Sequence, residues 1–386
     1  IRDVYKRQLP PIADLTAGKY LVSSLRNVEI DDLLGRSPVP PDAALLREVV
    51  EGRRIMVTGA GGSIGSQLCR TIAQWNPASI VLFESSEFAL YNIDRQLRQI
   101  AGCEIVPILG SVSSRECVEK AIRDHNVDTV YHCAAYKHVP LVEKNPLVGI
   151  FNNVFGTLEV AQAALETDVE RMVLISSDKA VRPTNVMGAT KRWAELVVYY
   201  CGMLAEQSGK KKAFYSVRFG NVLGSNGSVV PLFREQIASG GPITLTHDDM
   251  TRYFMSIKEA AELIVQSGGI AASGDTVLLE MGEPVRIRDL AENMILLAGL
   301  TVRNEENPHG DIAIEVTGIR EGEKMYEELF YDPSLAQPTR HPKIMRAPKG
   351  NKAAVDVPAS LAALRIAMES GDVDAVRKVL FDVIAS

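Results

Sequence analysis

Three consecutive side chains in the middle of the chain, Ser177, Asp178 and Lys179, carry groups that can move protons. They follow the apolar residues 171–176, which we predict to form a strand. An acid beside an amine suits proton transfer on a bound substrate, with the amine as base and the acid as donor. The amine is a base near neutral pH only when its pKa is lowered, and burial beside a second cation such as Lys191 supplies that shift. The competing interpretation is an ion pair on a surface turn.

Met187 and Lys191 come next, at the start of a predicted helix that extends to about residue 208. Because they are four positions apart, they share one face of that helix. A thioether cannot accept a proton, so Met187 is no base. The proton of a substrate hydroxyl would have to pass to another group, and Lys191 and a bound water are the candidates.

A glycine-rich segment joins a predicted strand, residues 54–58, to a predicted helix, residues 66–74. Its glycines have the spacing G-x-x-G-x-x-G. Glycine lets the backbone approach a pyrophosphate, and the N-terminus of the helix adds N–H donors and a favourable dipole. We therefore predict a dinucleotide site formed by Gly59, Gly62, Ser63, Ile64 and Gly65.

Small and acidic residues follow the next predicted strands. Glu84 ends the second strand, where a carboxylate can accept hydrogen bonds from the ribose hydroxyls of NAD and would repel the 2′-phosphate of NADP. Glu87 could take this role instead, and an ordinary surface glutamate is the alternative. Ser111 follows the third strand, near the expected adenine, and Ala134 and Ala135 follow the fourth. We therefore expect NAD as the cofactor.

The elements that must hold these groups alternate between strands and helices. The predicted strands are residues 54–58, 79–83, 104–109, 129–133, 171–176 and 213–218, and the predicted helices between them are residues 66–74, 90–100, 117–124, 148–166 and 189–208. Alternation at this spacing predicts an α/β fold with a doubly wound parallel sheet. Ligands of such sheets bind at the carboxyl ends of the strands, which is where the residues above stand.

We expect four regions along the chain. They are a lead-in arm (1–50), a dinucleotide-binding Rossmann domain (51–225, with 252–282 returning to it), a smaller mixed α/β substrate-binding lobe (226–251 and 283–345) and a C-terminal helical tail (346–386). The first region is rich in proline, and the last contains two short amphipathic helices at about 358–369 and 372–384.

Composition narrows the class of protein. The net charge of −6 over 386 residues argues against nucleic acid as a partner. The five cysteines are scattered, which favours a reducing compartment and predicts neither a disulfide framework nor a metal site. We expect this chain in the cytoplasm, without a membrane segment. It begins without Met, so we interpret residues 1–8 as a truncation, and the full-length protein could carry an inner-membrane anchor upstream.

The groups around Ser177 resemble the active site of the short-chain dehydrogenases/reductases. In that superfamily a Ser or Thr after the fifth strand works with a Tyr-x-x-x-Lys pair on the next helix. Ser177 and Lys191 match this pattern, whereas Met187 stands at the position of the Tyr. The acid and base at 178 and 179 are similar to the pair found in nucleotide-sugar 4,6-dehydratases.

Four longer motifs sharpen this resemblance. They are YKHVPLVE (136–143), SDKAVRPTNVMG (177–188), RFGNVLGS (218–225) and MTRYFM (250–255). They closely resemble the bacterial UDP-N-acetylglucosamine 4,6-dehydratases of the large capsular-polysaccharide type, over about residues 28–345. The large members carry Met where short relatives carry Tyr, and they have membrane helices and another domain before the catalytic part. Ser111 departs from the family, which usually has Asp there.

The resemblance implies a role for each reacting group. C4 of the sugar is oxidised, Lys179 removes the C5 proton, Asp178 protonates the leaving C6 hydroxyl, and hydride returns to C6. The expected substrate-binding residues are Lys137, His138, Asn221, Arg252, Arg320 and Glu323. Arginines suit a pyrophosphate because they donate paired hydrogen bonds to its oxygens. We also expect a homo-oligomer.

Two other functions fit parts of this pattern. A UDP-sugar 4-epimerase needs the same cofactor and the same lobe, but it normally keeps the Tyr and gives Asp178 and Lys179 no purpose. A protein that binds NAD without turnover is favoured only by Met187. The configuration at C5 of the product stays open, although the resemblance favours retention.

Overall fold

The computed structural model describes residues 39–348, 352 and 354–385. The chain divides into two compact units. The larger unit contains Val39–Gly220, Ile257–Met281 and Glu321–Ser386, and the smaller unit contains Asn221–Ser256 and Gly282–Arg320 among its described residues. The predicted lead-in arm falls on residues 1–50, of which 1–38 lie outside the described part.

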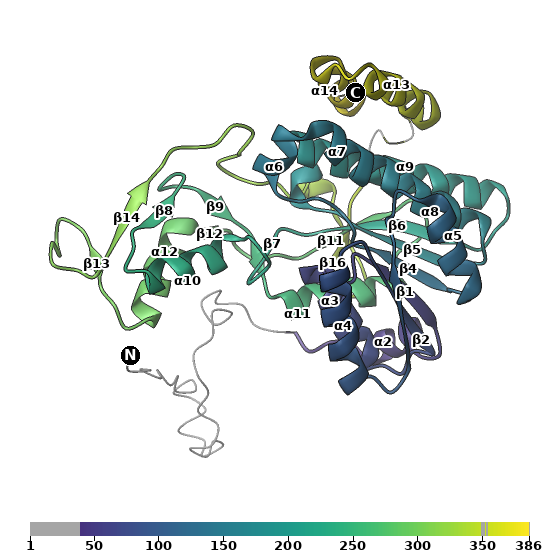
Figure 1. Ribbon diagram of the computed structural model, residues 1–386, viewed down its shortest axis with the longest axis horizontal. Coiled ribbons are helices and arrows are strands. Elements are labelled where there is room, and N and C mark those ends of the chain that lie inside the picture. Colours follow the sequence, from purple (N-terminus) through teal and green to yellow (C-terminus); the bar gives the residue numbers. More distant parts are fainter. Residues whose placement is uncertain (1–38, 349–351, 353, 386) are drawn as a thin grey trace. The chain divides into compact units, whose positions relative to one another are not determined.

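The larger unit is built on a nine-stranded sheet of order β15-β16-β11-β6-β5-β4-β1-β2-β3 (Figure 1). The strands are β1 (Arg54–Thr58), β2 (Ser79–Glu84), β3 (Glu104–Leu109), β4 (Thr129–His132), β5 (Arg171–Ile175), β6 (Ala213–Arg218), β11 (Thr276–Leu279), β15 (Gln337–Pro338) and β16 (Ile344–Arg346). Pairs from β3 to β11 are parallel, and β16 and β15 add an antiparallel edge. The strand order reverses between β1 and β4, which is the switch point where such sheets bind ligands. The predicted doubly wound α/β fold is confirmed.

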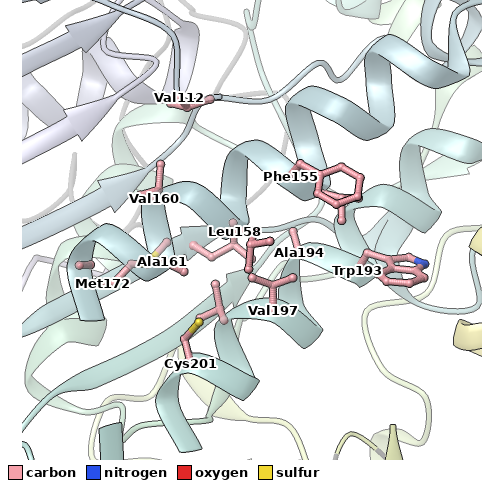
Figure 2. Close-up of a cluster of buried hydrophobic side chains, with 14 of the residues drawn as sticks. Val112, Phe155, Leu158, Val160, Ala161, Met172, Trp193, Ala194, Val197 and Cys201 are labelled. Carbon is pink, nitrogen blue, oxygen red and sulfur yellow. The ribbon is translucent and has the colours of Figure 1, made fainter. Parts of the chain in front are cut away.

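Helices cover both faces of this sheet. One face is packed by α2 (Ala43–Val50), α3 (Ser63–Ala73), α4 (Glu87–Ile100) and α11 (Ile257–Gln266), and the other by α5 (Arg115–Asp124), α8 (Gly156–Glu166) and α9 (Val186–Gln207) (Figure 1). Figure 2 shows the core on the second face, where Leu158 of α8 lies near Ala194 and Val197 of α9. The core strands are buried along most of their length because both faces are covered.

Helix α2 forms the last eight residues of the predicted lead-in arm, Ala43–Val50, where the sequence predicted no helix. Asp42 caps it, because its carboxylate accepts the backbone N–H groups of Ala44 and Leu45. Its apolar side is fully buried at Leu46 and Val49 and packs against α11. The prolines of this region suggested a linker, but Pro40 and Pro41 stand just before a helix.

The predicted long helix over 148–166 is divided into three pieces. These are α7 (Pro146–Ile150), the π-helix η3 (Phe151–Phe155) and α8. A π-helical turn inserts an extra residue per turn, which turns side chains away from their ideal helical directions. Apolar periodicity does not reveal such a turn.

Residues 321–345 belong to the larger unit, whereas the sequence grouped them with the smaller lobe. The side chains of Thr184 and Asn185 donate hydrogen bonds to the carbonyl of Gly322, over 3.1 and 2.9 Å. Arg182 pairs with Glu328 at 2.5 Å. These contacts hold the segment against the loop before α9.

The smaller unit is a mixed set of short strands and two helices. Its elements are β7 (Asn221–Val222), α10 (Val229–Ala238), β8 (Ile243–Leu245), β9 (Thr251–Arg252), β10 (Phe254–Met255), β12 (Val285–Arg286), α12 (Ile287–Leu297), β13 (Val302–Arg303) and β14 (Ile312–Val316). Strand β14 pairs with both β8 and β13, and β9 pairs with β12.

Two helices end the chain, α13 (Val357–Ser370) and α14 (Val373–Ala385), close to the predicted ranges. They pack on each other and on α9. Val376 and Leu380 of α14 are fully buried. In the part of the chain that the structure describes, we find no helix long and apolar enough to cross a membrane.

A buried ion pair joins α9 to the sheet. Arg218 of β6 donates two hydrogen bonds to Glu195, over 2.6 and 2.5 Å, and Ser176 donates a third over 2.7 Å. Burial raises the pKa of Glu195, but the charge and hydrogen bonds of Arg218 outweigh it and lower that pKa to about 2. The carboxylate therefore stays charged inside the protein.

Glu195→Gln should reduce the free energy of unfolding by about 3 kcal/mol, because it leaves the buried Arg218 without a matching charge. The measurement is urea unfolding followed by circular dichroism. Glu119→Gln is the control, since its pair with Arg123 is exposed and should be worth about 0–1 kcal/mol. Equal losses of unfolding free energy at the two positions would contradict the conclusion that Glu195 is the charge partner of the buried Arg218.

Candidate active site

The glycine loop after β1 is packed so closely that side chains are excluded at three positions. A Cβ atom at Gly59 would lie 2.8 Å from the backbone of Ala134, and the φ of Gly59 is +64°. At Gly65 it would lie 2.1 Å from the carbonyl oxygen of Gly59. At Gly61, which the sequence analysis did not single out, it would lie 2.5 Å from Cβ of Ala89. These contacts bring the start of α3 directly onto the ends of β1 and β4.

Helix α3 presents its N-terminus at this loop. Gly62 is its N-cap, and no side chain caps the helix there. Ser63 and Ile64 lie in its first turn. Backbone N–H groups at the start of a helix, with the positive end of its dipole, form a ready site for phosphate oxygens. The loop therefore fits a dinucleotide pyrophosphate on its steric and electrostatic properties alone.

Glu84 is tied to the same loop. Its Oε2 accepts the N–H of Gly61 at 3.0 Å, and its Oε1 accepts the N–H groups of Ser85 and Ser86 at 2.9 and 3.0 Å. The carboxylate is thus held at the carboxyl end of β2. Ser111 is exposed beyond β3, and its hydroxyl accepts the N–H of Ser113 at 3.2 Å.

The reacting groups sit in a short 3-10 turn, η4 (Asp178–Ala180), after β5. One oxygen of Asp178, Oδ1, accepts three hydrogen bonds: from the hydroxyl of Ser177 at 2.8 Å, the backbone N–H of Lys179 at 2.9 Å and the Nζ of Lys179 at 3.0 Å. Asp178 is fully buried, and its other oxygen, Oδ2, has no hydrogen-bond partner among the described residues. The carboxylate is therefore oriented through one oxygen, and its second oxygen is buried without a hydrogen-bond partner among the described residues.

Helix α9 packs its first turn against η4. A Cβ atom at Gly188 would lie 2.3 Å from the carbonyl oxygen of Lys179, so only glycine permits this approach. Met187 is buried, and Lys191, one turn later, donates from Nζ to the carbonyl of Ile175 at 2.5 Å. Burial is the main cause that lowers the pKa of Lys191 to about 8. The structure thus brings the predicted residues after β5 together with those on α9.

A buried chain of hydrogen bonds connects the strand before the glycine loop to α9, and the sequence analysis missed it. Thr157 donates to the carbonyl of Asn153 at 2.6 Å, so its oxygen accepts from His132 Nε2 at 3.0 Å. His132 Nδ1 then accepts the hydroxyl of Thr58 at 2.8 Å. Burial and the charge of Lys191 lower the pKa of His132 to about 3, which keeps the ring neutral.

Asn153, in the π-helix, extends this chain to the loop after β4. Its amide exchanges two hydrogen bonds with the backbone of Tyr136, at 2.8 and 2.9 Å, and donates a third to the hydroxyl of Thr190 at 3.0 Å. The next residue, Lys137, has a lowered pKa because of burial first and the charge of Lys179 second. The loop after β4 therefore places Lys137 within electrostatic reach of the reacting lysine. The pKa of the neighbouring His138 is also lowered, by burial and then by Lys137.

The remaining predicted substrate residues divide between the two units. Asn221, Arg252 and Arg320 belong to the smaller unit, and Glu323 belongs to the larger. Arg252 is buried and donates to the carbonyl of Thr251 at 2.7 Å. Their roles in binding stay predictions. Among the described residues, no three His, Cys, Asp or Glu side chains are grouped as a metal site would require.

The chain is similar in sequence to enzymes and biosynthesis proteins of several bacteria. The capsular polysaccharide biosynthesis protein CapD of Staphylococcus aureus is 46% identical over 88% of this chain and 55% of its own length. A UDP-N-acetylglucosamine 4,6-dehydratase (inverting) of Campylobacter jejuni is 30% identical over 72% of this chain and 78% of its own. Relatives named UDP-glucose 4-epimerase, from Rickettsia, match at 29–30% identity. The chain spans about half the length of the first of these proteins.

Solved structures agree with the fold. The protein Pen of Bacillus thuringiensis superimposes with a TM-score of 0.69 and 32% identity, over 78% of this chain and 90% of its own. A dTDP-glucose 4,6-dehydratase of Streptomyces venezuelae, DesIV, solved with NAD, superimposes with a TM-score of 0.60 and 20% identity, over 72% and 88%. Residues 55–349 match the family described as "Polysaccharide biosynthesis protein". This match covers the glycine loop, Ser177, Asp178 and Lys179, and most of the described residues, and the chain belongs to the polysaccharide biosynthesis protein family.

Proposed function

We propose that this chain dehydrates UDP-N-acetylglucosamine to a UDP-4-keto-6-deoxy-N-acetylhexosamine, with NAD as cofactor, for bacterial polysaccharide or glycan biosynthesis. The observation that carries the proposal is the geometry of Asp178, whose Oδ1 accepts hydrogen bonds from Ser177 and Lys179 while its buried Oδ2 has no hydrogen-bond partner among the described residues. An epimerase transfers hydride at C4 alone and has no use for such an acid–base pair. Kinship with a UDP-N-acetylglucosamine 4,6-dehydratase supports the same choice.

The glycine loop and Glu84 fit NAD. The loop excludes side chains where a pyrophosphate would lie, and Glu84 stands where ribose hydroxyls would reach it. Gly59, Gly62 and Gly65 would hold the pyrophosphate with the first turn of α3, and Lys191 would face the nicotinamide half. When bound, NAD takes up the hydride from C4 and gives it back at C6. DesIV, which shares this fold, was solved with NAD.

The pair formed by Asp178 and Lys179 can supply both proton transfers of the elimination. One proton passing from Nζ to the carboxylate, across their 3.0 Å contact, leaves a neutral amine and a carboxylic acid. The amine then takes the C5 proton, which the C4 ketone has acidified, and the acid protonates the departing C6 hydroxyl.

The smaller unit supplies the groups for the anionic half of the substrate in this proposal. Arg252 and Arg320 would bind the diphosphate of UDP, with Asn221 as a further donor. Lys137, His138 and Glu323 belong to the larger unit, where they would contact the sugar and the nucleotide.

Incubation with UDP-N-acetylglucosamine should give a 4-keto-6-deoxy sugar, recognised in the ¹H NMR spectrum by a new C6 methyl signal. The physical reason is that only elimination across C5 and C6 turns the hydroxymethyl group into a methyl group. UDP-N-acetylgalactosamine as the product would establish the epimerase instead. Unchanged substrate would favour a protein that binds NAD without turnover.

Lys179→Ala should abolish the 4-keto product, because the variant lacks the base for C5, while NAD still binds with the wild-type Kd. Product is followed by NMR and NAD binding by isothermal titration calorimetry. Lys144→Ala, at an exposed lysine of the same unit, is the matched control and should keep full activity. A fully active Lys179→Ala would overturn the mechanism.

Lys191 should make the stability of the free protein depend on pH. Its pKa is about 8 when folded against 10.5 for the free group, so between these values the unfolded chain binds more protons and stability rises with pH. The variant Lys191→Met has no titrating group at this position, so it lacks this rise of stability with pH. Its stability relative to the wild type should therefore fall by roughly 2–3 kcal/mol between pH 7 and pH 10. Urea unfolding at both pH values measures it, with Lys144→Met as control, and a constant difference would refute the buried charge.

A further inference from the structure

Helix α9 starts on a carboxylate that comes from another helix. Glu143, in α6 (Val139–Lys144), accepts the backbone N–H of Val186 through its Oε1. The N-cap Asn185 accepts the N–H of Gly188 at 2.8 Å. Two of the orphan donors of the first turn are thus satisfied by side chains, and the negative charge of Glu143 suits the positive end of the helix dipole.

The second oxygen of Glu143 is held from the C-terminal helices. Arg377 of α14 donates from Nη1 to Oε2 at 2.6 Å. The Glu143 side chain is 12% exposed and that of Arg377 is 33% exposed, so the carboxylate of this pair is largely shielded from water. A charge-assisted hydrogen bond in such surroundings is stronger than one on an open surface. Arg377 therefore restricts Glu143 to the orientation that meets the start of α9.

Helix α14 is itself anchored to α9 one turn further along. The indole Nε1 of Trp193 donates to the carbonyl of Leu380 at 2.8 Å, and both residues are buried. Val376 and Leu380 complete the core that also contains Met187. Because α14 is fixed in this way, Arg377 is a rigid support. The family match ends at residue 349, so this support lies outside it.

We propose that Glu143 is a positioning residue for the reacting groups and that Arg377 acts through it, so that the C-terminal helices control the geometry of the active site. The part of this proposal that concerns turnover rests on the function proposed above. The path is short: Arg377 fixes Glu143, Glu143 fixes the first turn of α9, and that turn carries Met187 and touches the carbonyl of Lys179 through Gly188. Small displacements of reacting groups carry large rate penalties.

The test is the variant Arg377→Met, compared with Lys378→Met at the next, exposed position of the same helix. Both remove one positive charge from α14, but only Arg377 contacts Glu143. In Arg377→Met we expect amide hydrogen exchange in residues 186–190 to become about tenfold faster, and kcat to fall about tenfold with KM little changed. Lys378→Met should match the wild type in both. Arg377→Lys, which keeps the charge, should recover part of kcat.

The variant Glu143→Gln distinguishes a positioning role of Glu143 from a role in folding. Its amide oxygen can still accept the N–H of Val186, but the ion pair is lost, so it should lower kcat as Arg377→Met does. In the double variant the two losses should not add, because both break one chain of contacts. Additive losses, or exchange that quickens in α13 and α14 but not in residues 186–190, would overturn the proposal. The exchange result holds even if the wild type fails to dehydrate UDP-N-acetylglucosamine, which would refute only the proposed function.

Discussion

The site depends on one backbone contact, the packing of the first turn of α9 against the turn that carries Asp178 and Lys179. The contact exists because Gly188 has no side chain, since a Cβ atom there would lie 2.3 Å from the carbonyl of Lys179. It sets where Met187 and Lys191 stand relative to the acid–base pair. Groups on a strand end and groups on a helix then act as one site, although they come from separate elements. The ion pair between Glu195 and Arg218, further along α9, holds the same helix on β6.

The parts that sequence could predict are those encoded locally. The glycine loop, the acid at the end of β2 and the pair at 178 and 179 all follow apolar strands, so their place at one edge of the sheet follows from the alternation of elements. The predicted smaller lobe was residues 226–251 and 283–345, whereas the smaller unit contains Asn221–Ser256 and Gly282–Arg320 among its described residues. The prediction failed where it depends on long-range contacts. Residues 321–345 are held in the larger unit by contacts to Thr184 and Asn185, and no local sequence pattern reveals those contacts. Helix α2 was missed because nearby prolines outweighed a short apolar face.

The buried polar chain through His132 was out of reach for a similar reason. Its members, Thr58, His132, Thr157 and Asn153, come from two strands and two helical segments, and each alone is an unremarkable core residue. Every donor in it has an acceptor, which a buried network needs in order to stabilise the fold. With a pKa of about 3, His132 stays neutral and cannot exchange protons with a substrate near neutral pH. His132 is therefore a rigidly held structural residue that connects the strand before the glycine loop to the helices beside α9.

Met187, in the first turn of α9, is buried and belongs to the apolar core beneath that helix. Its thioether cannot accept a proton, so this position supplies no base. The first turn of α9 instead packs against the turn that carries Asp178 and Lys179 and fixes its position. In the proposed reaction, proton transfer falls to Asp178 and Lys179, whose backbone α9 contacts through Gly188. The strength with which α9 is held would then help to determine the geometry of that proposed acid–base pair.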